Sequence, residues 1–263
     1  MSTIWAIYKK ELRTYFTTPI AYVVLAVFTL ITGFFFDQYV KLFQRATMQY
    51  MQFQNPKVLE QLNMTDLIAR PVVMNIGIIL VFMTPLLTMR LLAEERKMNT
   101  FELIMTAPIT LWQIIVGKFT AAFTVVFLMT GVTFLYPVSL DFFAVEGSGV
   151  GWNTVISSYV GLLLVSAAFV AVGLLASSVT ENQIVAAVIS FVTLLLLWVV
   201  NWAAQSASGV LQDVLANISF IEHMQNFSKG LIEVKSVVFF VTFTFFGLFL
   251  TYRVLESQRY AGS

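Results

Sequence analysis

The sequence contains no cysteine and only one histidine, His223. The first absence excludes disulfide bonds and thiol catalysis, and the two together exclude metal sites built from cysteine and histidine. Charged residues are also scarce, at 11% of the 263 residues, whereas soluble globular domains contain about 25%. The formal net charge of +1 indicates no surface for nucleic acid.

Apolar residues make up most of the chain, at 59% of the total, and six long runs contain no Asp, Glu, Lys, Arg or His. A helix of about 17 to 25 residues crosses a hydrocarbon layer of roughly 30 Å. We therefore expect an all-α membrane protein with one transmembrane domain, residues 1–263. The expected spans are residues 17–36, 71–90, 112–136, 155–179, 183–203 and 236–254.

The distribution of basic residues predicts the orientation. Six spans place both termini on one side of the membrane. Nine of the 15 lysines and arginines lie on that side, and six lie in the opposite loops. By the positive-inside rule, both termini and the loop after the second span are expected to be cytoplasmic.

Three further segments carry amphipathic patterns. Residues 1–16 predict a helix in the interface plane, although they could also be ordinary flanking residues of the first span. Residues 37–53 repeat apolar side chains at helical spacing, which we interpret as a separate cap on the outer surface. Residues 206–235 are too polar to cross twice and predict a re-entrant or surface-lying helical hairpin. Trp198 and Trp202 fit an aromatic belt at the outer interface.

Two absences limit the source of energy. The uncharged runs hold no carboxylate, lysine or arginine, and ion-coupled carriers commonly need such groups inside the membrane. The chain also lacks a GxxxxGK[ST] phosphate loop, so we do not expect it to be an enzyme. Energy for movement must then come from a partner.

The central segment, Arg90–Lys118, is the most polar connection between two uncharged runs. It carries seven charged residues, which suit either a handle for a partner or a solvated loop, and the pattern alone leaves both open. Thr110 and Gln113 at its end fit a capping box, which predicts a well-defined start for the third span.

Three motifs carry a family resemblance. MRLLAEERKMNTFELIMTAPITLWQIIVGKF (residues 89–119) resembles the first cytoplasmic loop of ABC type-2 transporter permeases, particularly the gliding-motility-associated subfamily. GLLASSVTENQIVAAVISF (residues 173–191) resembles the hairpin between their fourth and fifth spans, and HMQNFSKGLIEVKSVVFF (residues 223–240) resembles the approach to their last span. The similarity covers nearly the whole chain.

The resemblance implies a multi-pass protein of a bacterial inner membrane, in which two six-span subunits sit on two ATPase subunits. Residues 94–108 would form a coupling loop that docks on the ATPase, and the 180–182 hairpin would add a smaller contact. ATP and magnesium would bind the partner, with no cofactor in this chain. The implied contact residues are Glu94, Glu95, Thr100, Glu102, Pro108, Glu181 and Asn182.

The leading hypothesis is therefore a permease subunit that couples ATP hydrolysis by a partner ATPase to export or to rearrangement of its spans. Its other partners would be the bilayer, a second copy or a paralogue, and an accessory membrane subunit. The alternative is a scaffold that recruits an ATPase to a surface or motility machine. If two copies enclose a route, Ser190, Thr193 and Asn201 of the fifth span would line it; packing within one chain is the other explanation for these residues.

Overall fold

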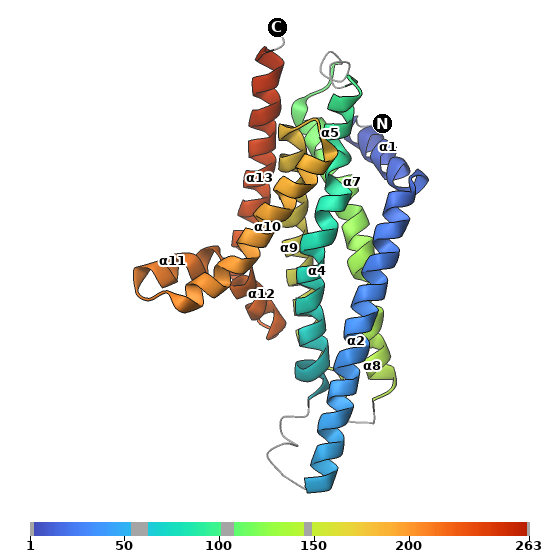
Figure 1. The fold of residues 1–263 in the computed structure, drawn as a ribbon, viewed down its shortest axis with the longest axis vertical. Coiled ribbons are helices and arrows are strands. Elements are labelled where there is room, and N and C mark those ends of the chain that lie inside the picture. The colour runs from blue at the N-terminus through green and yellow to red at the C-terminus, as the bar shows by residue number, and fades with distance from the viewer. Residues whose placement is uncertain (1–2, 54–62, 101–107, 145–148, 262–263) are drawn as a thin grey trace.

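The computed structural model describes residues 3–53, 63–100, 108–144 and 149–261. Within these ranges every regular element is helical, and six helices are long and apolar enough to cross a membrane. The prediction of an all-helical chain with six candidate spans is confirmed. Both termini lie at the same end of the bundle (Figure 1), which we call the terminal end.

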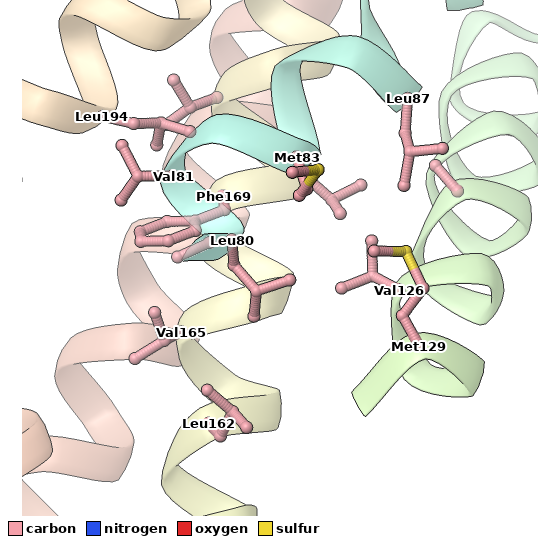
Figure 2. Close-up of a cluster of buried hydrophobic side chains, with 14 of the residues drawn as sticks. Leu80, Val81, Met83, Leu87, Val126, Met129, Leu162, Val165, Phe169 and Leu194 are labelled. Atoms are coloured by element: carbon pink, nitrogen blue, oxygen red, sulfur yellow. The ribbon is translucent and has the colours of Figure 1, made fainter. Parts of the chain in front are cut away.

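Helix α9 (Trp152–Val179) forms the centre of the bundle. It packs against α4 (Arg70–Thr88), α7 (Leu111–Thr133), α10 (Gln183–Ser206) and α13 (Val234–Ala261). Figure 2 shows the core where Leu80 and Val81 of α4 meet Phe169 of α9 and Leu194 of α10.

Small residues allow this close packing. A Cβ atom added at Gly173 would lie 2.0 Å from the Thr88 hydroxyl oxygen, and one at Gly161 would lie 2.6 Å from the Phe227 side chain. Both positions therefore require glycine, because packing at such distances needs the backbones to approach without side chains between them.

The first two helices differ from the expected pattern. Helix α1 (Thr3–Thr17) ends just before Pro19, where α2 (Pro19–Phe53) begins at an angle to it (Figure 1). The 35 residues of α2 extend about 50 Å, beyond the roughly 30 Å of hydrocarbon. Residues 37–53 continue this helix, so the interpretation as a separate surface cap was wrong. No glycine or proline interrupts them, and the Lys41–Asp37 ion pair of 2.6 Å spans one turn.

The second and third spans begin and end with short extra segments. A π-helical turn, η1 (Thr65–Ala69), precedes α4, and a break at Met89 separates α4 from α5 (Arg90–Lys97). Helix α7 continues into α8 (Leu135–Phe142). The predicted capping box at its start is confirmed: Gln113 N donates to Thr110 Oγ1 at 3.3 Å, and Thr110 N donates to Gln113 Oε1 at 3.1 Å.

The segment between α10 and α13 folds as two short helices, α11 (Val210–Ile218) and α12 (Phe220–Ser228). No residue of α11 is buried, and this helix projects away from the bundle (Figure 1). By contrast, α12 packs against α9, and Arg70 Nε donates a 2.8 Å hydrogen bond to the Ser228 carbonyl at its end.

The two tryptophans of α10 have different surroundings. Trp202 is 64% exposed, as a residue of an aromatic belt would be in the isolated chain, but Trp198 is only 5% exposed. Its ring lies over Gly77 and packs edge-to-face with Phe169 at 6.2 Å. The placement of Trp198 in the belt was therefore wrong, because the absence of a side chain at Gly77 makes room for it in the core.

Candidate functional site

Helix α5 is fixed to the centre of the bundle by Ser177 of α9. The Ser177 hydroxyl accepts hydrogen bonds from Leu92 N at 2.9 Å and Ala93 N at 3.0 Å, and it donates to the Met89 carbonyl at 2.9 Å. The first amides of a helix have no partner within that helix. A side chain from another span supplies it here, so α9 determines where α5 starts.

The other end of α5 also has a defined geometry. Asn99 has a φ of 56°, a left-handed conformation that asparagine adopts more readily than most residues and that often ends helices. The amide and hydroxyl of Thr100 both donate to the Glu95 carbonyl, at 3.0 and 3.1 Å. These bonds turn the chain away after Lys97 and hold Thr100 beside the last turn of α5.

The exposed part of the site includes the hairpin between α9 and α10. A hollow of about 440 Å³ is lined by Lys97, Glu181, Asn182, Gln183 and Ile184. Glu181 lies within electrostatic reach of Arg96 on α5. Asn182 also caps α10, since its Oδ1 accepts from Ile184 N at 2.9 Å. The structure therefore places the hairpin residues next to the end of α5, although they are distant in sequence.

Helix α5 also contributes to a cluster of four charged side chains from three helices. Lys118 of α7 is 2% exposed. Its Nζ lies 2.9 Å from Glu11 Oε1 of α1 and 2.9 Å from Glu95 Oε1 of α5. Lys10 of α1 lies 2.9 Å from the same Glu95 oxygen, with its side chain 60% exposed. We call these four residues the charge cluster. Two cations and two carboxylates make it neutral.

Two groups of the charge cluster have displaced pKa values. Burial raises the pKa of Glu11, but the Lys118 ammonium and its hydrogen bond outweigh burial, so the pKa is lower than the usual 4.5. Burial lowers the pKa of Lys10, but the hydrogen bond to Glu95 and the two carboxylates raise it above the usual 10.5. Both groups are therefore held in their charged forms.

A cavity of about 180 Å³ adjoins the cluster, between α1, α5 and α7. Arg90 lines it with 8% of its surface exposed, and its guanidinium lies 4.7 Å from the centre of the Tyr15 ring. Within the described residues, Arg90 Nη2 and Glu95 Oε2 are buried without hydrogen-bond partners. Glu95 of the charge cluster and the neighbouring Arg90 thus each have a buried polar atom that is available for another hydrogen bond.

The residues implied by the family resemblance are distributed unevenly over this region. Glu94 is half-buried, Glu95 is buried in the charge cluster, and Thr100 is half-buried. Pro108 is exposed, two residues before the cap of α7. Glu102 lies outside the described residues, as do residues 101–107 of the expected coupling loop.

Sequence reasoning missed Glu11 and Lys118 as site residues. For Lys118, the sequence contained a signal in the spacing of apolar residues: it follows Leu111, Ile114 and Ile115 at the spacing of the buried face of α7. A charged residue at such a position needs a partner in the interior.

The three polar residues expected along a route in the fifth span do not share a face. Ser190 is fully buried, Asn201 is 5% exposed, and Ser219 Oγ donates to Asn201 Oδ1 at 3.4 Å. Thr193 is exposed and donates only to the Ile189 carbonyl, at 2.8 Å, among the described hydrogen bonds. The positions of Ser190 and Asn201 fit packing within one chain, whereas Thr193 faces outward.

Comparison with protein families gives one match that covers nearly the whole chain. The family described as "ABC-2 family transporter protein" matches residues 5–255. A search of curated proteins finds no match. The matched region includes the charge cluster, the exposed hairpin and all six candidate spans up to the last turns of α13.

Proposed function

Since the chain belongs to the ABC-2 transporter family, we propose that it is the permease subunit that couples ATP hydrolysis by a partner ATPase to movement of its spans. Membership supports a multi-pass membrane component of an ABC transporter. The finer parts of the proposal are the docking of the ATPase, the orientation, the pairing of subunits and the export of a substrate. ATP and magnesium would bind the ATPase and not this chain.

The observation that carries the docking proposal is the convergence of charged and polar groups at the terminal end. Glu94 and Lys97 of α5, Thr100 just after it, and Glu181 and Asn182 of the 180–182 hairpin make up what we call the docking surface; Lys97, Glu181 and Asn182 line one hollow, and Glu94 and Thr100 line the cavity beside the charge cluster. Both segments end helices that reach the centre of the bundle. A force applied there would be transmitted to α4, α9 and α10 together.

Orientation follows from the same proposal. If the docking surface meets a cytoplasmic ATPase, the terminal end lies on the cytoplasmic side of a bacterial inner membrane. The distribution of basic residues indicates the same orientation. The natural absence of cysteine allows a direct test. A cysteine at Met98 should react with an impermeant thiol reagent only from the cytoplasm, and one at Lys229 only from outside; the reverse pattern would contradict the orientation.

We further propose that two copies, or this chain and a paralogue, pair through the outward face of α10. This face exposes large apolar side chains and Thr193, but not Ser190 or Asn201. A transport route between subunits would then be lined by Thr193 and its exposed neighbours. The exposed residues are Ile184, Val185, Val188, Ile189, Val192 and Leu196.

Helix α12 supports a re-entrant segment at the outer end of this route. Phe220, at the start of α12, stacks on Phe169 in the middle of α9 with ring centroids 5.8 Å apart. After α12, Gly230 approaches Thr154 at the start of α9. The helix thus follows about half the length of a membrane-crossing neighbour.

The resemblance of the central segment to the gliding-motility subfamily adds a question about output. A permease in that setting could move a substrate or transmit a mechanical rearrangement to an accessory membrane subunit. ATP hydrolysis by the reconstituted complex should rise with substrate in the first case and with the accessory subunit in the second. The first outcome would exclude a pure scaffold.

The decisive experiment reverses one charge of the docking surface. Glu181→Lys should reduce copurification of the ATPase and its stimulation, because breaking a desolvated ion pair at an interface costs about 2 to 5 kcal/mol, against at most about 1 kcal/mol for an exposed pair. Glu222→Lys, at an exposed carboxylate of α12, is the matched control. If the two variants bind the ATPase equally well, the docking surface is a solvated connector.

A further inference from the structure

We propose that Lys118 is a positioning residue that clamps helix α5 to the N-terminal helix α1, so that α1 moves with the docking surface. The inference rests on the proposed function for its role in coupling, but the clamp itself is a property of this chain alone. It assigns a mechanical role to the buried charge cluster and to α1.

The first argument is the set of contacts at Lys118. Lys118 Nζ donates hydrogen bonds to Glu11 Oε1 at 2.9 Å and to the Leu91 carbonyl at 2.6 Å, and it lies 2.9 Å from Glu95 Oε1 as an ion pair. These acceptors come from α1 and α5, so one side chain of α7 binds both helices at once.

The second argument is that α1 is firmly attached to α7. The two helices pack along much of their length, and a Cβ atom at Gly117 would lie only 2.8 Å from the Ile7 side chain. Helix α5 is attached to α9 through Ser177. Glu95 of α5 pairs with Lys10 of α1 and with Lys118 of α7. The charge cluster therefore connects the α1–α7 pair of helices with the α5–α9 pair.

The third argument concerns what would follow from loss of the Lys118 charge. Glu11 and Glu95 would then be two carboxylates in a poorly hydrated site, with only the largely exposed Lys10 between them. Like charges repel strongly where solvent is excluded. The adjoining cavity offers Glu95 a new partner, since Arg90 Nη2 lines it without one among the described residues. We expect Glu95 to turn toward Arg90 and α5 to separate from α1.

The fourth argument is the position of Glu95 within α5. It lies next to Glu94 and two residues before Lys97, both on the docking surface. The eight residues of α5 form about two turns of helix, so we expect a displacement of its end to move Glu95 as well. Movement of the docking surface by the ATPase would therefore reach α1 through Glu95 and Lys118.

The test measures the separation of α1 and α5 without any ATPase. Spin labels at Lys9→Cys and Met98→Cys, both exposed positions, would report the distance distribution by pulsed electron resonance in lipid nanodiscs. Lys118→Met should broaden the distribution and move it to longer distances. Lys229→Met, an exposed lysine at the far end, should leave it unchanged.

A second variant separates charge balance from simple packing. Lys118→Met combined with Glu11→Gln and Glu95→Gln has no buried like charges but still lacks the ammonium, so its distance distribution should be narrower than that of Lys118→Met and remain broader than that of the wild type. If it coincides with that of the wild type, repulsion between the carboxylates explains the whole effect of Lys118→Met and the clamp is wrong. This variant also decides the matter if Lys118→Met alone cannot be purified in folded form.

The coupling role is tested with the ATPase in proteoliposomes. Lys118→Met should reduce the permease-stimulated kcat by about tenfold and leave the KM for ATP unchanged, because nucleotide binds the partner. An unchanged distance distribution would overturn the clamp, and an unchanged kcat with a broadened distribution would overturn its role in coupling. A wild-type chain that stimulates no ATPase would contradict the proposed function, while the spin-label result would still decide the clamp.

Discussion

Helices α9 and α10 are neighbours of nearly equal apolarity, yet they occupy opposite environments. In the most apolar 18-residue window of each helix, 72% of the α9 residues are buried and 22% of the α10 residues. Small residues occur on several faces of α9, including Gly161, Ala171 and Gly173, whereas α10 exposes large ones such as Ile184 and Leu196. Apolarity therefore identifies the spans, but side-chain size indicates which span is central.

The largest expected effect comes from the two tryptophans of α10. Trp198→Ala should lower the free energy of unfolding by about 3 to 5 kcal/mol, because it leaves a cavity against Gly77 and Phe169. Trp202→Ala, at an exposed position, should change it by less than about 0.5 kcal/mol in the monomer. Denaturation in detergent, followed by circular dichroism, would measure both. If both substitutions lowered the free energy of unfolding equally, α10 would not bury one face, with Trp198, in the core.

A smaller effect is expected from enlarging alanines on the two helices. Ala171→Leu in α9 should destabilise the protein by about 1 to 3 kcal/mol, because Ala171 is fully buried and faces Gly247 of α13 so closely that a Cβ built on that glycine would lie 3.1 Å from the Ala171 Cβ. Ala203→Leu in α10 is the same change at an exposed position and should be tolerated. Thermal unfolding midpoints would compare them. If Ala171→Leu is tolerated equally well, the central position of α9 does not depend on small residues.

A third test asks whether a second subunit covers the exposed face of α10. Val188→Cys, with Val188 54% exposed, should form an intermolecular disulfide on oxidation, whereas Ala186→Cys, fully buried in the chain, should not. Non-reducing electrophoresis after mild oxidation in membranes would show the dimer. A failure to crosslink at Val188 and at each of its exposed neighbours would indicate that lipid, and not protein, covers this face.

The smallest effect on stability is expected from a change of pH near neutrality, because Glu11 and Lys10 of the charge cluster keep their charges there. The pKa of Glu11 is lowered from 4.5 in the fold, so its stabilisation is complete above pH 4.5 and is lost as the pH falls through the folded value. The pKa of Lys10 is raised above 10.5, so its contribution is complete below pH 10.5 and is lost at higher pH. The contribution of Glu11 and Lys10 to the melting temperature should therefore stay constant between pH 4.5 and pH 10.5.

Lys118→Met sharpens this comparison of buried and exposed charge. Without the ammonium, burial should raise the pKa of Glu11, and the acid limb of the melting curve should begin at higher pH. Glu222→Gln, which removes an exposed carboxylate from α12, should not move that limb. If the acid limb of Lys118→Met coincides with that of the wild type, Lys118 does not control the ionisation of Glu11.

The sequence predicted the six spans because each uncharged run matches the length that a bilayer requires. It did not predict the full length of α2, since Asp37, Lys41 and Arg45 end the apolar run but do not break a helix. Their charges carry information about hydration and little about backbone conformation. The position of Trp198 was missed for a related reason: tryptophan suits both a membrane interface and a core, and only the glycine opposite it decides between them.

The candidate site was predictable where its signals were local. The capping box of α7 depends on Thr110 and Gln113, three residues apart, and it formed as expected. The contacts of Lys118 are not local, because Glu11 lies 107 residues away in the chain. Periodicity could place Lys118 on a buried face, but only the packing of α1 and α5 against α7 identifies its partners.

The bonding at Lys118 also constrains how this sequence can diverge over time. Loss of the Lys118 charge leaves Glu11 and Glu95 as two buried carboxylates with only the exposed Lys10 to pair with them, so this first step should be selected against. Relatives that lack the lysine should therefore have replaced carboxylates too, and relatives that lack only the lysine should be rare. Positions 11, 95 and 118 should behave as one inherited unit, although they lie in three separate segments of the gene.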